Sequence, residues 1–379
     1  MKRFSMRFIG LLVAGFLLAT LAVELTLRLT AATPLWRVLP VVEVSLYGPD
    51  PRTGYSHRPG ASGIWRTENR AEVTINYQGF RGAELPEPKS AGELRIAVVG
   101  DSMVEALQVD AAQMLTAVLE RQLKAAGRDV RVANFGLAGA TPAVQRERVA
   151  THVVARQPDV VVLMPNLDAF FGPKAADDSA FPAWVPTADG EVALRHAFRD
   201  SAGYRFRNST MGQLYYTLLD QLQIAGLLNN RKNAGFLPPS HAAPASVAPV
   251  DPCLAMAAYW RRLEDPVGWR RVAAYLNDMA VLGHEHGFRP VVALRSVAAN
   301  PSCSAVVQSL RDAAWRQIAA QAAAAQIPLH DMDTLVAAHL APDESVSRLH
   351  GFHHRLGRGH LNPRGHEVYA AVLTGILQP

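Results

Sequence analysis

The 379-residue sequence has few of the features that mark several functional classes. It contains only two cysteines, Cys253 and Cys303, and no histidine spaced to complete a cysteine-based zinc site. It has no run of lysine or arginine and no basic stretch interleaved with aromatic residues, so we expect no nucleic-acid partner. The formal net charge of +5 could favour acidic partners such as anionic polysaccharide or lipid headgroups, but a surface charge that only keeps the protein soluble explains it as well. The Gly-x-Ser-x-Gly motif of α/β-hydrolases and repeats of solenoid period are also absent.

The N-terminus carries a long apolar run. Lys2, Arg3 and Arg7 precede the apolar residues 8–23. This order of charge and apolar residues is typical of a secretory signal or of a membrane anchor whose N-terminus stays in the cytoplasm. We expect an uncleaved anchor, with cleavage near residues 20–22 as the alternative. In both cases the rest of the chain would lie outside the cytoplasm.

That location changes how the two cysteines are interpreted. In an oxidising compartment Cys253 and Cys303 could form a disulfide. The alternative is two free buried thiols, and the sequence leaves both open.

Strand and helix patterns alternate from residue 94 onward. Apolar runs predict buried strands at 94–99, 130–133, 160–164, 291–294 and 327–329. Nearly continuous apolar strands separated by helices predict an α/β fold with a central parallel sheet that is covered on both faces. The last helix is predicted to begin at Asn362-Pro363, because asparagine is a good N-cap and proline suits the first helical position.

We divide the chain into three parts. Residues 1–29 form the anchor or signal peptide, residues 30–93 a juxtamembrane stalk with short strands, and residues 94–379 the main domain. Within the main domain, residues 172–253 interrupt the alternation and predict an insertion at the rim of the sheet. This insertion could be a lid or partner-binding flap, or a passive solvated loop.

Four polar clusters follow strands or precede helices of the main domain. They are Gly100-Asp101-Ser102, residues 134–141 (NFGLAGAT), residues 165–168 (PNLD) and residues 359–363 (GHLNP). Open parallel sheets bind ligands outside the carboxyl ends of their strands, so these clusters could share one site. Together they supply the nucleophile, the base and the oxyanion donors that serine hydrolysis needs.

In this order and spacing the clusters resemble the four sequence blocks of the SGNH, or GDSL-type, hydrolase superfamily. The segments 24–29 (ELTLRL) and 75–82 (INYQGFRG) also look like a membrane-anchored bacterial branch of that superfamily. The resemblance implies a flavodoxin-like three-layer sandwich and a serine esterase in which Ser102 is the nucleophile and His360 the general base. It also implies an oxyanion hole formed by the backbone of Ser102, the backbone of Gly139 and the side chain of Asn166, with Asp101 in a supporting role.

Two positions depart from the superfamily pattern. An aspartate usually stands two or three residues before the histidine, where this sequence has Gly357 and Arg358. His360 could therefore work in a dyad, oriented by a backbone carbonyl, or use an aspartate from the preceding segment, namely Asp331, Asp333 or Asp343. In the third block an ungapped match puts Leu167 in the slot of the amide, and a shift of one residue restores Asn166 as the donor.

Several histidines near His360 raise the alternative of a metal site. They are His350, His353, His354 and His366. Metal-bound histidines are usually supported by a carboxylate or another outer partner, and the sequence identifies none. We therefore expect no metal and no cofactor, and we expect His366 to cap or pack the last helix.

The sequence supports two functional hypotheses. The first is a serine esterase in the bacterial inner membrane, with its catalytic domain in the periplasm. It would act by hydrolysis or acetyl transfer on ester groups, above all O-acetyl groups, of envelope or exported polysaccharide or of another small ester. The second is a catalytically impaired module that binds glycan or protein partners in an envelope assembly, which the missing aspartate favours.

Overall fold

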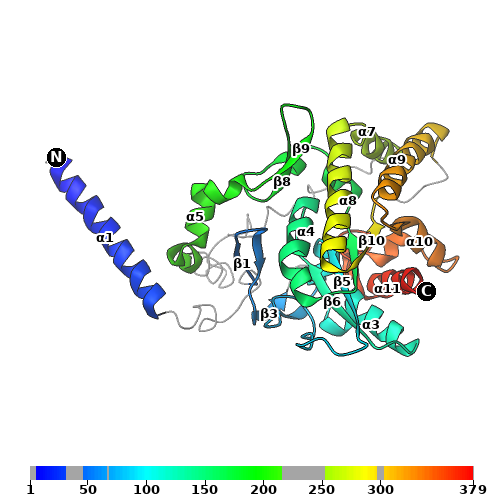
Figure 1. Ribbon diagram of the computed structural model, residues 1–379, viewed down its shortest axis with the longest axis horizontal. Coiled ribbons are helices and arrows are strands. Elements are labelled where there is room, and N and C mark those ends of the chain that lie inside the picture. Colours follow the sequence, from blue (N-terminus) through cyan, green and yellow to red (C-terminus); the bar gives the residue numbers. More distant parts are fainter. Residues whose placement is uncertain (1–5, 31–45, 66–67, 216–251, 297–302, 379) are drawn as a thin grey trace.

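A computed structural model describes residues 6–30, 46–65, 68–215, 252–296 and 303–378 (Figure 1). Its centre is a five-stranded sheet, in spatial order β11 (Leu329–Asp331), β10 (Arg289–Leu294), β7 (Val160–Met164), β5 (Leu94–Gly100) and β6 (Val130–Gly136). Every pairing in this sheet is parallel. The predicted α/β class and central parallel sheet are therefore confirmed, with β11 starting two residues later than expected.

The strand order places a switch point between β5 and β7. These two strands are neighbours in the sheet although β6 lies between them in the chain. The order is that of flavodoxin-like folds, in which the chain winds first toward one edge and then toward the other. Ligands of such sheets bind outside the carboxyl ends of the strands at the switch point, which here is the end of β5.

Helices cover both faces of the sheet (Figure 1). One face carries α3 (Leu115–Ala125), α10 (Met332–His339) and α11 (Pro363–Leu377), and the other carries α4 (Pro142–Arg148), α8 (Pro266–His286) and α9 (Ala305–Ala324). Successive side chains of a strand point to opposite faces. Ile96 and Val98 of β5 therefore join the first core, whereas Ala97 and Val99 join the second.

The last helix starts as predicted. The side chain of Asn362 accepts a hydrogen bond from the backbone N–H of Gly365 at 3.0 Å, and Pro363 occupies the first helical position. The Asn362 amide also donates to the carbonyls of Arg348, at 2.8 Å, and Gly351, at 3.2 Å. This cap therefore fixes both the helix and the loop that precedes it.

The N-terminal part adds the helix α1 (Met6–Thr30) and two antiparallel hairpins. One pairs β1 (Tyr47–Asp50) with β2 (Gly54–His57), and the other pairs β3 (Ser62–Trp65) with β4 (Ala71–Thr74). Among the described helices, none has the length and apolar character needed to cross a membrane. A small core joins the hairpins to the main domain, with Tyr55 and Val73 packed against Leu107 and Leu137. The hairpins thus lie against the carboxyl edge of the sheet.

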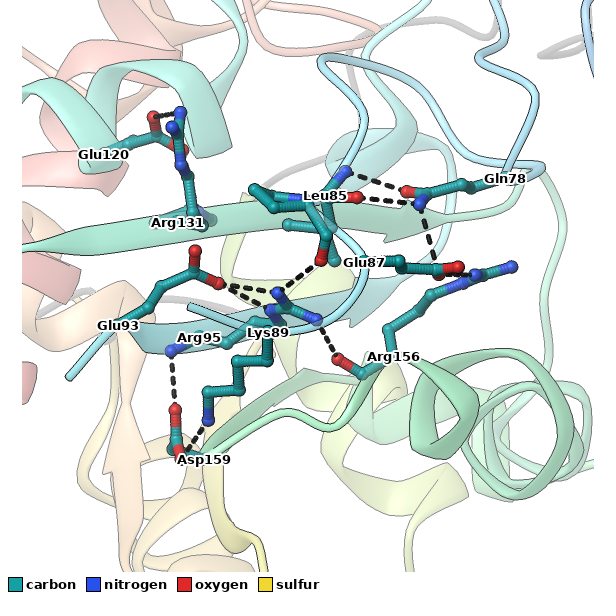
Figure 2. Close-up of polar contacts among 12 residues, drawn as sticks. Gln78, Leu85, Glu87, Lys89, Glu93, Arg95, Glu120, Arg131, Arg156 and Asp159 are labelled. Atoms are coloured by element: carbon teal, nitrogen blue, oxygen red, sulfur yellow. Dashed lines mark hydrogen bonds and ion pairs between the residues drawn. The ribbon is translucent and has the colours of Figure 1, made fainter. Parts of the chain in front are cut away.

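A polar network joins the linker between the hairpins and β5, residues 75–93, to the amino edge of the sheet (Figure 2). Arg95 is only 2% exposed, and its guanidinium binds Glu93 Oε1 at 2.8 Å and the carbonyl of Arg156 at 2.7 Å. Asp159 accepts from Lys89 Nζ at 2.5 Å and from the backbone N–H of Arg95 at 2.6 Å. These bonds hold the linker at the edge opposite the four polar clusters.

The described part of the predicted insertion contains the hairpin of β8 (Ala183–Pro186) and β9 (Val192–Arg195) and the helix α5 (Ala202–Asn208). Residues 216–251 of the insertion lie outside the described residues. Cys253, in α7 (Pro252–Arg262), forms a disulfide with Cys303, with an S–S distance of 2.04 Å. This bond joins α7 to the start of α9.

Candidate active site

Ser102 lies at the switch point of the sheet. The chain leaves β5 at Gly100 and forms the one-turn helix α2 (Ser102–Glu105). Asp101 caps this helix, because its Oδ1 accepts the backbone N–H of Met103 at 2.9 Å. The end of β6 passes directly beneath α2, where a Cβ on Gly136 would lie 2.1 Å from the backbone nitrogen of Glu105. The sheet and the helix cap thus present Ser102 at the ends of β5 and β6.

A chain of hydrogen bonds runs from Ser102 through His360 to Glu68. Ser102 Oγ lies 2.9 Å from His360 Nε2, and His360 Nδ1 lies 2.9 Å from Glu68 Oε1. The other oxygen of Glu68 accepts the backbone N–H of His360 at 3.0 Å. The carboxylate therefore holds both the ring and the backbone of the histidine. This is the arrangement of nucleophile, base and orienting acid in serine hydrolases.

Glu68 reaches His360 from outside the α/β layers. It lies between β3 and β4 and adopts a positive φ of 71°. Gly359, with φ +91°, makes room for it, since a Cβ at that position would lie 2.7 Å from Glu68 Oε2. Burial alone would raise the pKa of Glu68, but hydrogen bonds and charge from His360, with charge from Arg355, hold this pKa below its usual value. Glu68 is therefore an anion at neutral pH.

The three aspartates that the sequence offered as partners of His360 lie elsewhere. The contact between Glu68 and His360 therefore corrects the expectation that one of them orients the histidine. Asp331 caps α10 and forms an ion pair with Arg311. Asp333 is buried and accepts the backbone N–H of Ser296 at 2.5 Å. Asp343 is exposed on the surface. The first two belong to β11 and the start of α10, at the edge of the sheet away from β5, so Glu68 replaces all three as the candidate acid.

Asp101 has a partner that the sequence did not indicate. Arg295 follows β10 directly, and its guanidinium forms an ion pair with Asp101 Oδ2. Burial alone would lower the pKa of Arg295, but Asp101 raises it above its usual value. Asp101 therefore supports the turn before Ser102 rather than contacting His360.

The two further oxyanion candidates border the same edge. Gly139 lies in the loop after β6 with φ +72°, and the neighbouring carbonyl of Ala138 accepts the hydroxyl of Tyr55. Asn166 follows β7 and forms a β-bridge with Arg295, and the backbone N–H of Leu167 donates to the Arg295 carbonyl at 2.8 Å. The loop positions of both residues are thus fixed by neighbouring segments, and their role as donors remains a prediction.

Three of the histidines near His360 have separate partners. His366 is fully buried, and its Nδ1 accepts the backbone N–H of Leu115 at 3.2 Å, so burial lowers its pKa to about 3. His350 Nδ1 lies 3.1 Å from the carbonyl of Gly359, and His353 Nε2 lies 3.2 Å from Asn69 Oδ1. His354 belongs to the same loop. Within the described ranges, histidine, cysteine and carboxylate side chains form no group of three that could hold a metal ion.

No protein-family model and no curated protein matches the sequence. The structure is similar to TesA, at 15% identity over 75% of this chain and 98% of that chain, with a TM-score of 0.36. It is also similar to a lipase/acylhydrolase from Enterococcus faecalis (14% identity, 75% and 95% covered, TM-score 0.35) and to the acetyl xylan esterase AlAXEase (12%, 75% and 100%, 0.37). These values are too low to carry a functional argument, which therefore rests on the geometry of the site.

Proposed function

We propose that this protein is a serine ester hydrolase of the SGNH type, in which Ser102, His360 and Glu68 act as a catalytic triad. The observation that carries the proposal is the continuous chain of hydrogen bonds between these three side chains. A serine hydroxyl is a weak nucleophile until an oriented base removes its proton. Contacts of 2.9 Å on both ring nitrogens of His360 meet that requirement.

The reaction follows from which atoms donate and accept. His360 donates its Nδ1–H to Glu68, which leaves Nε2 free to accept the proton of Ser102 as Oγ attacks the acyl carbonyl. Glu68 stabilises the imidazolium ion that results. The alcohol leaves with the proton from Nε2, and an acyl group remains on Ser102. Water then repeats the sequence, giving the free acid and regenerating the serine.

The oxyanion of each tetrahedral intermediate needs hydrogen-bond donors. The backbone N–H groups of Ser102 and Gly139 and the side-chain amide of Asn166 are our candidates. Their support is that they lie on the loops after β5, β6 and β7, the three strands whose carboxyl ends surround the nucleophile. Each such donor typically contributes a factor of about 10² to 10³ to kcat.

The proposed substrate is an acylated carbohydrate, with O-acetyl groups of envelope or exported polysaccharide as the first choice. A sugar hydroxyl in place of water would turn hydrolysis into acetyl transfer at the same serine. We further propose that the chain is held at the bacterial inner membrane with its catalytic domain in the periplasm. The support is the order of basic residues and the apolar run at 8–23, together with the Cys253–Cys303 disulfide, which suits an oxidising compartment.

The alternative of an impaired binding module rested on the missing aspartate near His360. Glu68 provides a carboxylate at the same ring nitrogen, so that argument no longer favours it. An enzyme is therefore the better proposal.

The test measures hydrolysis of p-nitrophenyl acetate and release of acetate from acetylated oligosaccharides by the full chain. We expect turnover that is lost in Ser102→Ala and His360→Ala. A second series of p-nitrophenyl esters with longer acyl chains checks the preference for acetyl. Turnover that persists in Ser102→Ala, or a folded wild type that turns over no ester, would refute the proposal.

A further inference from the structure

The far end of the nucleophile helix is held by a buried carboxylate. Glu105, the last residue of α2, is 0% exposed. Its Oε1 accepts the hydroxyl of Tyr47 at 2.6 Å and lies 2.6 Å from His57 Nε2. Tyr47 and His57 face each other across the β1–β2 hairpin. The hairpin thus binds directly to the helix that carries Ser102.

His57 continues this contact into the main domain. Burial lowers the pKa of His57, despite the opposing effect of Glu105, so the ring is neutral at neutral pH. Its Nε2–H therefore donates to Glu105, and its Nδ1 accepts from Arg148, at 3.3 Å. Arg148 is 0% exposed and also donates to the carbonyl of Phe135 in β6, at 2.9 Å. A polar network thus connects α2, the hairpin and β6.

A second N-terminal residue holds the backbone at the same end of α2. Arg81, from the NYQGFRG segment, is 1% exposed. Its guanidinium donates to the carbonyls of Glu105, at 3.3 Å, and of Ala106 and Val109. The opposite end of the helix is held by the Asp101–Arg295 pair. The single turn that carries Ser102 is therefore fixed at both ends.

We propose that Glu105, together with Tyr47, His57 and Arg81, positions Ser102 against His360, so that the N-terminal hairpins are part of the catalytic unit. Ser102 and Glu105 belong to the same helical turn, and a shift of Glu105 moves the serine hydroxyl relative to His360 Nε2. A displacement of about 1 Å at a reacting atom can cost about a hundredfold in rate. This inference rests on the proposed function, because it assigns residues that act through its nucleophile.

Two variants of the full chain and one matched control test the assignment. Glu105→Gln removes the charge that Tyr47 and His57 bind, and Tyr47→Phe removes one of the two donors with less disturbance. Glu93→Gln is the control, since Glu93 is also buried and pairs with Arg95, but at the opposite edge of the sheet (Figure 2). Each protein is labelled with a fluorophosphonate, which reacts with activated serines. The final amplitude of labelling gives the fraction of molecules whose serine can react. The rate constant of labelling gives the reactivity of the serine in those molecules.

We expect Glu105→Gln to label with nearly full amplitude, but with a rate constant per site that is about ten- to a hundredfold lower than that of the wild type. For Tyr47→Phe we expect the rate constant per site to fall by at least about threefold. Glu93→Gln should lose thermal stability and keep the wild-type rate per site. A purely structural role would lower the amplitude and leave the rate per site unchanged, and that result would overturn the assignment. If Glu105→Gln does not fold, Tyr47→Phe decides by the same criterion. A wild type that does not label refutes the proposed function itself, whereas wild-type rates in both variants refute only this inference.

Discussion

Replacing Glu68 by glutamine removes the carboxylate that orients His360 and changes little else in size. An ionised carboxylate can only accept, so it fixes the proton of the ring on Nδ1 and leaves Nε2 to act as the base. A glutamine amide could instead donate to Nδ1, which would place the proton on Nε2 and block its reaction with Ser102. The substitution also removes the negative charge that stabilises the imidazolium ion formed during the reaction.

The expected loss of catalytic rate in Glu68→Gln can be worked out from the contact between Glu68 and His360. The His360 and Glu68 side chains are 25% and 20% exposed, so solvent screens their interaction in part. For unit charges about 4 Å apart, the attraction is about 1 kcal/mol in water and about 4 kcal/mol at an effective dielectric constant near 20. These energies correspond to roughly 5- to 1000-fold in rate. The unfavourable tautomer adds to this, since the equivalent change in a serine protease costs about 10⁴ in kcat. We therefore expect kcat/KM to fall about 10²- to 10⁴-fold.

The assay compares p-nitrophenyl acetate hydrolysis by wild type, Glu68→Gln and Glu72→Gln. Glu72 is an exposed carboxylate on the neighbouring strand β4, so its substitution controls for loss of charge in this region. Glu72→Gln should keep wild-type activity. If Glu68→Gln also stays within about twofold of wild type, Glu68 is not the orienting acid and His360 works without one.

Three other predictions concern the remaining parts of the molecule. Asn166→Ala should lower kcat about 10²- to 10³-fold with little change in thermal stability, and an unchanged kcat would remove Asn166 from the oxyanion hole. Burial raises the pKa of Asp333 to about 6, above the value of 3.8 expected in the unfolded chain. Between these two pH values the folded state binds more protons than the unfolded state, so the protein loses stability as the pH rises through about 6. Asp333→Asn should therefore raise the free energy of unfolding at pH 8 by up to roughly 3 kcal/mol and by much less at pH 4, and equal effects at both pH values would contradict this. The disulfide joins residues that are 50 positions apart in the sequence. The double variant Cys253→Ser and Cys303→Ser should therefore lower the free energy of unfolding by about 2–4 kcal/mol. A melting temperature equal to that of the oxidised wild type would contradict this prediction.

The sequence predicts the central sheet, and it identifies Ser102 and His360 as candidate reacting residues, because these signals are local. The apolar runs that become β5 and β7 match the observed strands closely, and the cap at Asn362 marks the start of the last helix at the correct residue. Ser102 and His360 lie within short blocks beside these elements. A parallel sheet brings such blocks together at one edge whatever the details of packing.

Glu68 could not be predicted in the same way. It is separated from His360 by 292 positions, lies in no recognisable motif and belongs to a region expected to form a stalk. Its contact depends on how the two hairpins fold back over the carboxyl edge of the sheet. The partnership of Arg295 with Asp101 is equally a product of tertiary packing, since β10 and β5 are separated in the sheet by β7. The departure from the expected pattern at Gly357 and Arg358 was the one available signal that an acid must come from elsewhere.

The measurement that tests the central claim most directly is mass spectrometry of the full chain after reaction with a fluorophosphonate. The account predicts a single covalent adduct, mapped by peptide analysis to Ser102, that is absent in Ser102→Ala and forms far more slowly in His360→Ala and Glu68→Gln. A folded wild-type protein that acquires no adduct, or an adduct on another residue that forms equally well in His360→Ala, would contradict it.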